Sequence, residues 1–214
     1  MTLRRLFQSF RAPRAESAQG LERGREPWLL VGLGNPGERY ARSRHNLGFL
    51  AIELIAREAA ISLGQQRFKA RLGKGDLDGN PVLLAQPQTF MNLSGESVVS
   101  LLGYFKLPPG RLLVIHDELD LEPGVVRLKR GGGDGGHRGL RSIIELLGNA
   151  NFLRLRIGVG HAPQGREPVS YLLEPLSASQ MAEFQPQLQR AVQAARAVIN
   201  DGVERAMNQF NQRG

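Results

Sequence analysis

The apolar residues of this chain follow two alternating spacings. Short apolar runs bounded by turn residues indicate buried strands, and stretches with apolar residues at i, i+3, i+4 and i+7 indicate helices. The strand-like runs are residues 28–31, 68–72, 82–85, 112–115, 126–128 and 153–159. The helical stretches are residues 47–55, 94–105, 140–147 and much of the chain from about residue 177. This order predicts an α/β fold, a single domain with a mixed, twisted sheet between helices.

Local signals refine this prediction. Asp78-Gly79 lies between two strand-like runs and predicts the turn of an antiparallel hairpin, whose first strand we place from Phe68. Ser94 is a candidate N-cap for the helix that follows, and Pro108-Pro109-Gly110 ends that helix. Gly202 is a candidate break between the C-terminal helices.

Length and composition restrict the class of protein. A chain of 214 residues suits one domain, and 41% hydrophobic with 22% charged residues is typical of a globular protein. The absence of Cys excludes disulfides and thiolate metal sites. No run of 18 apolar residues occurs, so we expect no membrane partner.

The chain is basic, with a formal net charge of +8. Such a balance favours an anionic partner, foremost nucleic acid. Of the 28 basic residues, Lys occupies positions 69, 74, 106 and 129 and the other 24 are Arg. Because genome composition alone can produce that skew, charge leaves the nature of the partner open.

Residues 1–27 differ from the rest of the chain. They hold six Arg against three Glu, and Leu3, Leu6, Phe7 and Phe10 recur at helical spacing. We interpret them as a basic, disordered N-terminal extension of a cytoplasmic protein, followed by one α/β domain over residues 28–214. An organellar transit peptide is the alternative, because such peptides are Arg-rich, amphipathic and poor in acids.

The loop that follows the first strand contains Gly32-x-Gly34-x-x-Gly37, which matches the dinucleotide-binding fingerprint. That fingerprint requires a helix beginning at the glycines, so that its N-terminus faces the pyrophosphate. Here the helical spacing begins only at Leu47. A dinucleotide-binding oxidoreductase is therefore the weaker interpretation.

The same loop carries candidate catalytic groups. Imidazole can take a proton from water at neutral pH, which makes His45 a candidate general base. Asp117, at the end of another strand, could orient that imidazole, and the carboxamides of Asn35 and Asn92 could position water or donate to an oxyanion. We expect no metal, because His116 and Asp117 are adjacent strand residues that face opposite sides.

A cluster of glycines follows two cations, Lys129 and Arg130, and runs from Gly131 to Gly139. Glycines allow the backbone to approach a phosphate closely, and Lys or Arg can bind that phosphate. We expect phosphate contact here; the alternative is a mobile loop with solvated charges.

The motifs together resemble the bacterial peptidyl-tRNA hydrolase family. The matching stretches span most of the chain from Trp28 to about Ala206, in family order: VGLGNPGERYARSRHNLGF, QTFMNLSGESV, HDELDLEPG, GGGDGGHRGL and FLRLRIGVGH. The resemblance implies a cofactor-independent enzyme, which we expect to be monomeric. Its substrate would be peptidyl-tRNA, and cleaving the ester between peptide and tRNA would return tRNA from aborted translation.

The resemblance also implies roles for particular residues. His45 matches the general base, Asp117 its carboxylate partner, and Asn35 the residue that recognises the N-blocked peptide. Lys129 and Arg156 match a clamp on the 5′ phosphate of the acceptor stem. The positions that match contacts to the 3′ end and the peptide are Tyr40, Phe90, Met91, Asn92, His137 and Arg138.

Two residues of the glycine cluster depart from the family pattern, which usually reads Gly-His-Gly-Gly-His-Asn-Gly. Asp134 replaces the first His and Arg138 replaces the Asn. Because Arg has no hydrogen-bond acceptor, Arg138 cannot reproduce both faces of a carboxamide. These departures leave open a second interpretation, a non-catalytic RNA-binding relative.

Overall fold

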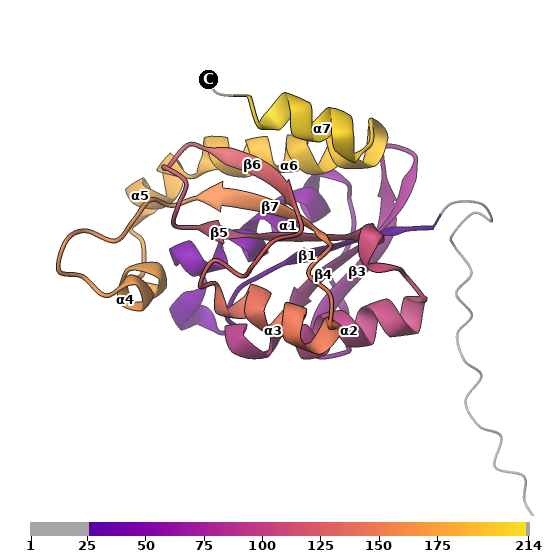
Figure 1. Cartoon of the computed structure of the whole chain (residues 1–214), viewed down its shortest axis with the longest axis horizontal. Coiled ribbons are helices and arrows are strands. Elements are labelled where there is room, and N and C mark those ends of the chain that lie inside the picture. Colours follow the sequence, from indigo (N-terminus) through magenta and orange to yellow (C-terminus); the bar gives the residue numbers. More distant parts are fainter. Residues whose placement is uncertain (1–25, 213–214) are drawn as a thin grey trace, which may run out of the picture.

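The computed structural model describes residues 26–212. It shows one seven-stranded sheet with helices on both faces (Figure 1). The strands are β1 Trp28–Gly32, β2 Gln65–Arg67, β3 Ala70–Leu77, β4 Asn80–Pro87, β5 Leu112–Glu118, β6 Val126–Arg130 and β7 Leu153–Gly158. The helices are α1 Leu47–Glu58, α2 Ser94–Phe105, α3 Arg138–Leu147, α4 Pro168–Leu173, α5 Ala178–Glu183, α6 Gln185–Asn200 and α7 Val203–Phe210.

The sheet is mixed, with strand order β2-β3-β4-β1-β5-β7-β6. Strand β1 lies between β4 and β5 and is parallel to both, and β7 is parallel to β5. Strands β2, β3 and β6 pair antiparallel with their neighbours. The predicted fold class is confirmed. Loops that follow the parallel strands meet at one rim, where open α/β sheets bind ligands.

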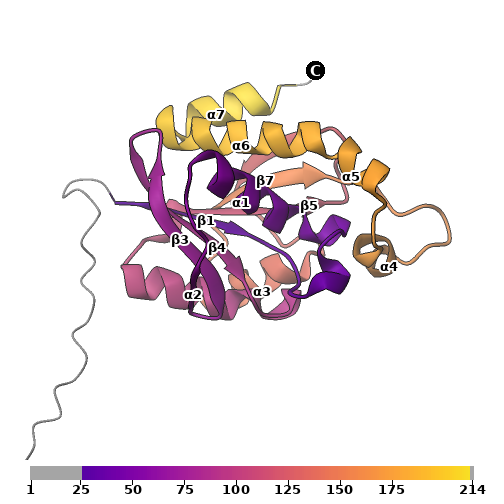
Figure 2. The same ribbon diagram turned by 180° about the vertical axis from the view of Figure 1, so that it is seen from behind.

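Alternating residues of each central strand supply two hydrophobic cores. On one face, Leu30, Leu84 and Ile115 pack with α1, α6 and α7. On the other face, Leu29 and Val31 pack with α2 and α3. Figure 2 shows α1 and α6 on the first of these faces. Strands buried on both sides explain why the central runs are apolar throughout rather than alternating.

Gly32 at the end of β1 and Gly48 of α1 allow close packing between the helix and the sheet. A Cβ on Gly32 would lie 2.1 Å from the carbonyl oxygen of Gly48, and a Cβ on Gly48 would lie 2.3 Å from that of Ile115. No helix starts at the glycines of the dinucleotide-binding fingerprint, since α1 begins only at Leu47. The close contact seats the start of α1 directly over the ends of β1 and β5.

Two local predictions were wrong by one or two residues. Phe68 lies outside β3 with a positive φ of 54°, because it belongs to the turn that joins β2 and β3. Ser94 is the first residue of α2 rather than its N-cap, and its hydroxyl donates to the carbonyl oxygen of Met91. The hairpin of β3 and β4 and the break at Gly202 are confirmed.

Helix α4 was missing from the sequence-based prediction. Its signal was present, since Pro168 occupies the first helical turn and Val169, Leu172 and Leu173 recur at i, i+3 and i+4. Within residues 26–212, no helix is long and apolar enough to cross a membrane. The prediction for residues 1–27 lies almost wholly outside the described residues.

Candidate active site

The loop after β1 is held by a side chain from within the loop. The Asn46 carboxamide accepts a hydrogen bond from the Asn35 backbone N–H and donates one to the Asn35 carbonyl oxygen, both at 2.9 Å. Asn35 in turn uses its Oδ1 to accept from the Met91 N–H at 2.8 Å. The amide group of Asn35 is therefore left as a donor toward the rim of the sheet.

His45 lies in the 3-10 turn Arg44–Asn46 that leads into α1. Its Nδ1 is 3.0 Å from each carboxylate oxygen of Asp117 at the end of β5. Because Nδ1–H donates to a carboxylate, Nε2 remains as the atom that can accept a proton. The predicted pairing of His45 with Asp117 is confirmed.

Asp117 accepts a second hydrogen bond, from Nε2 of His137 at 3.2 Å. The other ring nitrogen of His137 accepts from the N–H groups of Gly139 and Leu140 and so caps α3. These bonds fix which nitrogen of His137 carries its hydrogen. The structure therefore places His137 against the carboxylate, where it supports Asp117.

Charge and burial act in opposite directions on the pair. Burial lowers the pKa of the His45 imidazole, but the charge and hydrogen bond of Asp117 outweigh it, so the net pKa lies above 6.5 despite the opposing charge of Arg138. Burial alone would raise the pKa of the Asp117 carboxyl, yet the neighbouring imidazoles of His45 and His137 hold it well below its usual range. Asp117 is therefore a carboxylate at neutral pH.

A pocket of about 440 Å³ opens over this pair. Its lining includes all but two of the site residues that the sequence predicted: Asn35, Tyr40, His45, Phe90, Met91, Asn92, Asp117, His137 and Arg138. It also includes Gly135 and Gly136 of the predicted glycine cluster, and residues that the prediction missed: Glu118, Leu119, Pro168, Val169, Leu172 and Leu173. The pocket thus combines one polar centre with apolar walls, a common form of small-ligand site.

The apolar wall formed by α4 is fastened to the turn that holds His45. Arg44 donates to the carbonyl oxygen of Tyr171 and forms an ion pair with Glu174, while its guanidinium lies 4.0 Å from the centre of the Tyr171 ring. A β-bridge joins Ser43 to Pro175. The wall and the base are therefore parts of one packed unit.

The sequence model of the peptidyl-tRNA hydrolase family matches residues 29–214. The chain belongs to this family. Peptidyl-tRNA hydrolase of Moorella thermoacetica is 47% identical over 184 residues, which cover 86% of this chain and 97% of the relative. The mitochondrial enzyme of rice is 45% identical, covering 87% of this chain and 75% of the relative.

Solved structures agree with that assignment. The crystal structure of peptidyl-tRNA hydrolase from Acinetobacter baumannii superposes with a TM-score of 0.81 at 40% identity. The match covers 87% of this chain and 95% of that chain.

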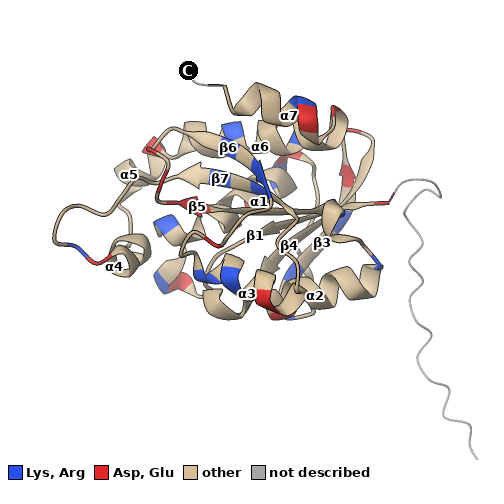
Figure 3. Cartoon of the chain, in the orientation of Figure 1, with Lys and Arg blue, Asp and Glu red and all other residues tan. Residues whose placement is uncertain are grey.

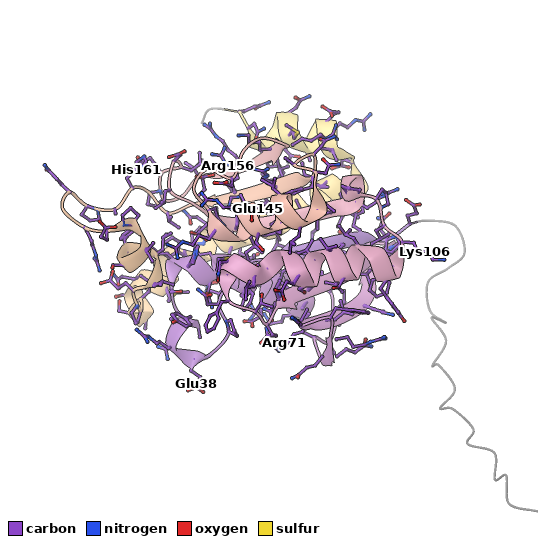
Figure 4. The ribbon with its side chains drawn as sticks, turned by 60° about the horizontal axis from the view of Figure 1, so that its bottom comes forward. Glu38, Arg71, Lys106, Glu145, Arg156 and His161 are labelled. Carbon is purple, nitrogen blue, oxygen red and sulfur yellow. The ribbon has the colours of Figure 1, made fainter. Side chains whose placement is uncertain are left out.

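Lys129 and Arg156, the two remaining predicted residues, line a separate pocket of about 250 Å³ beside the first. Figure 3 shows Lys and Arg on β6, on β7 and at the start of α3. In Figure 4, Arg156 lies on the side of the molecule away from Arg71. Arg156 is paired with Glu118 at 2.7 Å, whereas Lys129 is exposed. Of the two cations, Lys129 is the one with its charge available.

Arg154, which lines the pocket of Lys129 and Arg156, is a further residue that sequence reasoning missed. It is 2% exposed and donates to the carbonyl oxygens of Gly132 and Gly133. Its partner on β6 is Lys129, and both residues line the pocket of about 250 Å³. The alternation Arg154-x-Arg156 on a strand indicates a shared face, but nothing in the sequence distinguishes the buried arginine from the one that is 19% exposed.

Among the described residues, one group of three side chains could hold a metal ion. The group comprises His45, Asp117 and His137, whose ligand atoms lie within 4.8 Å of one another. Nδ1 of His45 and Nε2 of His137 lie 3.0 and 3.2 Å from Asp117, which are hydrogen-bond distances. The second nitrogen of His45 can accept a proton, and the second nitrogen of His137 caps α3. The hydrogen-bonded pair is sufficient to explain the arrangement.

Proposed function

We propose that this chain hydrolyses the ester between the peptide and the 3′ end of tRNA in peptidyl-tRNA, with His45 as general base on water. The observation that carries the proposal is the contact of Nδ1 of His45 with Asp117, which leaves Nε2 available in the pocket. The family assignment supports the substrate. We further propose that the chain acts as a monomer in the cytoplasm, without metal or cofactor.

The reaction uses only groups in the pocket. Water gives a proton to Nε2 of His45, and its oxygen attacks the ester carbonyl carbon while the C=O electron pair moves onto oxygen. Asp117 stabilises the imidazolium that forms. Collapse of the tetrahedral intermediate expels the 3′ ribose oxygen, which takes the proton back from His45. The products are a peptide with a free carboxyl group and tRNA with a free 3′ hydroxyl.

The orientation of Asn35 suits recognition of the peptide. Its Oδ1 is occupied by the Met91 N–H, so its amide N–H groups face the pocket as donors. A blocked amino group carries an amide carbonyl that accepts such a bond, and the free ammonium of aminoacyl-tRNA carries only donors. We therefore assign Asn35 to selection of N-blocked substrates, with Asn92 as a second donor nearby.

The tRNA end of the substrate fits the adjoining surfaces. Phe90 is 61% exposed at the pocket and offers a ring for base stacking, with Tyr40 and Met91 in the same lining. The pocket of Lys129 and Arg156 suits the 5′ phosphate of the acceptor stem. The aromatic lining serves the 3′ end of the tRNA, and the cations serve its 5′ phosphate. Because the phosphate contact is electrostatic, the affinity for tRNA falls as the salt concentration rises.

The decisive experiment is turnover of purified peptidyl-tRNA by His45→Ala. General-base help is worth about 10²–10⁴-fold, so kcat falls by that factor. His161→Ala is the matched control, since that imidazole is 72% exposed and outside the pocket. Equal loss in both variants, or full activity in His45→Ala, contradicts the proposal. Binding of tRNA without turnover by the intact chain would instead identify a non-catalytic RNA-binding relative.

The pH dependence gives an independent check. His45 acts as a base only when neutral, and Asp117 holds the pKa of its imidazole above 6.5. The acid limb of kcat/KM is therefore centred above pH 6.5, and activity falls as the pH drops through the pKa of the imidazole. A profile that stays flat down to pH 5 contradicts this assignment.

A further inference from the structure

Among the described residues, Arg138 is the one cation that lines the pocket over His45 and Asp117 without pairing with a carboxylate. It is the first residue of α3, directly after His137, and its side chain is exposed. Its neighbours are neutralised, because Arg141 pairs with Asp134 and Arg156 pairs with Glu118. The charge of Arg138 therefore remains available to a ligand.

The position of this charge is unfavourable for a neighbouring general base. Arg138 and His45 line the same pocket, and the positive charge of Arg138 opposes protonation of the imidazole. A cation beside a general base weakens that base, so the arrangement serves catalysis only if the same cation stabilises something else in the transition state. In ester hydrolysis, the group that gains negative charge next to the base is the carbonyl oxygen.

We propose that Arg138 is a catalytic residue whose guanidinium donates hydrogen bonds to the ester carbonyl oxygen as that oxygen becomes an oxyanion. This inference rests on the proposed function. Water held at Nε2 of His45 must lie about 3 Å from the carbonyl carbon, so a cation near His45 is also near the oxyanion. The guanidinium has hydrogen-bond donors and no acceptor. It can therefore stabilise an oxyanion, but it cannot accept the proton that the attacking water loses.

The two roles of Arg138 act on different parts of the rate profile. As an oxyanion donor, it raises kcat with little effect on KM, because the interaction forms only in the transition state. As a neighbour of His45, it shifts the acid limb to lower pH. The titratable and charged groups that surround His45 in the pocket and its turn are Tyr40, Arg44, Asp117, Glu118, His137 and Arg138. Only the last of these changes in the test.

The test compares Arg138→Gln, Arg138→Lys and the control Arg205→Gln on peptidyl-tRNA. Arg205 lies exposed on α7, against the opposite face of the sheet, so the control removes an equal charge far from the pocket. Arg138→Gln is expected to lower kcat by about 10²-fold, the lower end of the range for one oxyanion donor, with KM nearly unchanged. Its acid limb moves to higher pH, because the His45 imidazole is no longer opposed by a cation. Arg138→Lys keeps the acid limb and loses less activity.

Two results would overturn this inference. One is a rise in KM with kcat retained and a weaker salt dependence in Arg138→Gln, which would place the guanidinium on a tRNA phosphate. The other is unchanged kcat and an unchanged pH profile. His45→Ala, assayed in parallel, separates the two proposals: turnover retained there contradicts the proposed base, whereas its loss beside a fully active Arg138→Gln contradicts only the role of Arg138.

Discussion

Two of the loops that contribute polar groups to the pocket are held in contrasting ways. The loop after β1 is closed by neutral hydrogen bonds between Asn35 and Asn46, and both residues are buried. The glycine cluster before α3 is mostly exposed, and two arginines from outside the cluster hold it. Arg154 donates to its backbone carbonyl oxygens, and Arg141 pairs with its Asp134.

The difference matches what each loop must do. The first loop positions a base whose distance to Asp117 sets its protonation, so it is built into the core. The glycine cluster carries Arg138, which faces substrate, and it lies next to the pocket of Lys129. Removing a buried hydrogen bond between neutral groups costs much stability, so such bonds fix the geometry of a loop. Exposed ion pairs contribute little to stability and are screened by salt.

Asn46→Ala has the largest expected effect on stability in this comparison. It leaves the N–H and carbonyl of Asn35 buried without partners, which costs about 1–3 kcal/mol for each orphaned group. Urea unfolding of this variant and of Asn149→Ala, an exposed asparagine that also bonds a backbone N–H, measures the difference. If the two variants unfold at the same urea concentration, the first loop is not held as we describe.

Arg154→Gln sharpens the comparison within the glycine cluster. It removes two charge-assisted bonds from a buried donor and should lower the unfolding free energy by about 1–3 kcal/mol, with a several-fold loss of kcat because Arg138 and His137 lose their support. Arg141→Gln, which breaks only an exposed pair, should have a clearly smaller effect on both. A larger effect of Arg141→Gln would reverse our assignment of the anchor.

Lys129→Ala has the smallest expected effect, confined to binding. Loss of one phosphate contact raises KM and lowers the slope of log affinity against log salt by about one, with kcat unchanged. Lys74→Ala is the control, because Lys74 lies on β3 toward the other edge of the sheet, against Phe105. Equal salt slopes for the two variants would exclude Lys129 from the tRNA contact.

The sequence by itself determined the fold class and the chemistry available. The strand and helix spacings predicted the mixed sheet. The placement of His45 in the loop after one strand and of Asp117 at the end of another predicted their meeting. Both follow from local patterns, since parallel strands bring their carboxyl ends to one rim whatever the details of packing.

Tertiary structure alone decided how the remaining groups are used. His137 faces Asp117 because it caps α3, Arg156 is neutralised by Glu118, and Arg154 is buried under the glycine cluster. Strand β6 runs antiparallel to β7, so the cluster leaves the sheet at the far end and reaches the pocket at the rim from Gly135 onward. Such contacts join residues distant in the chain, and one sequence shows which charges exist but not which of them are paired on folding.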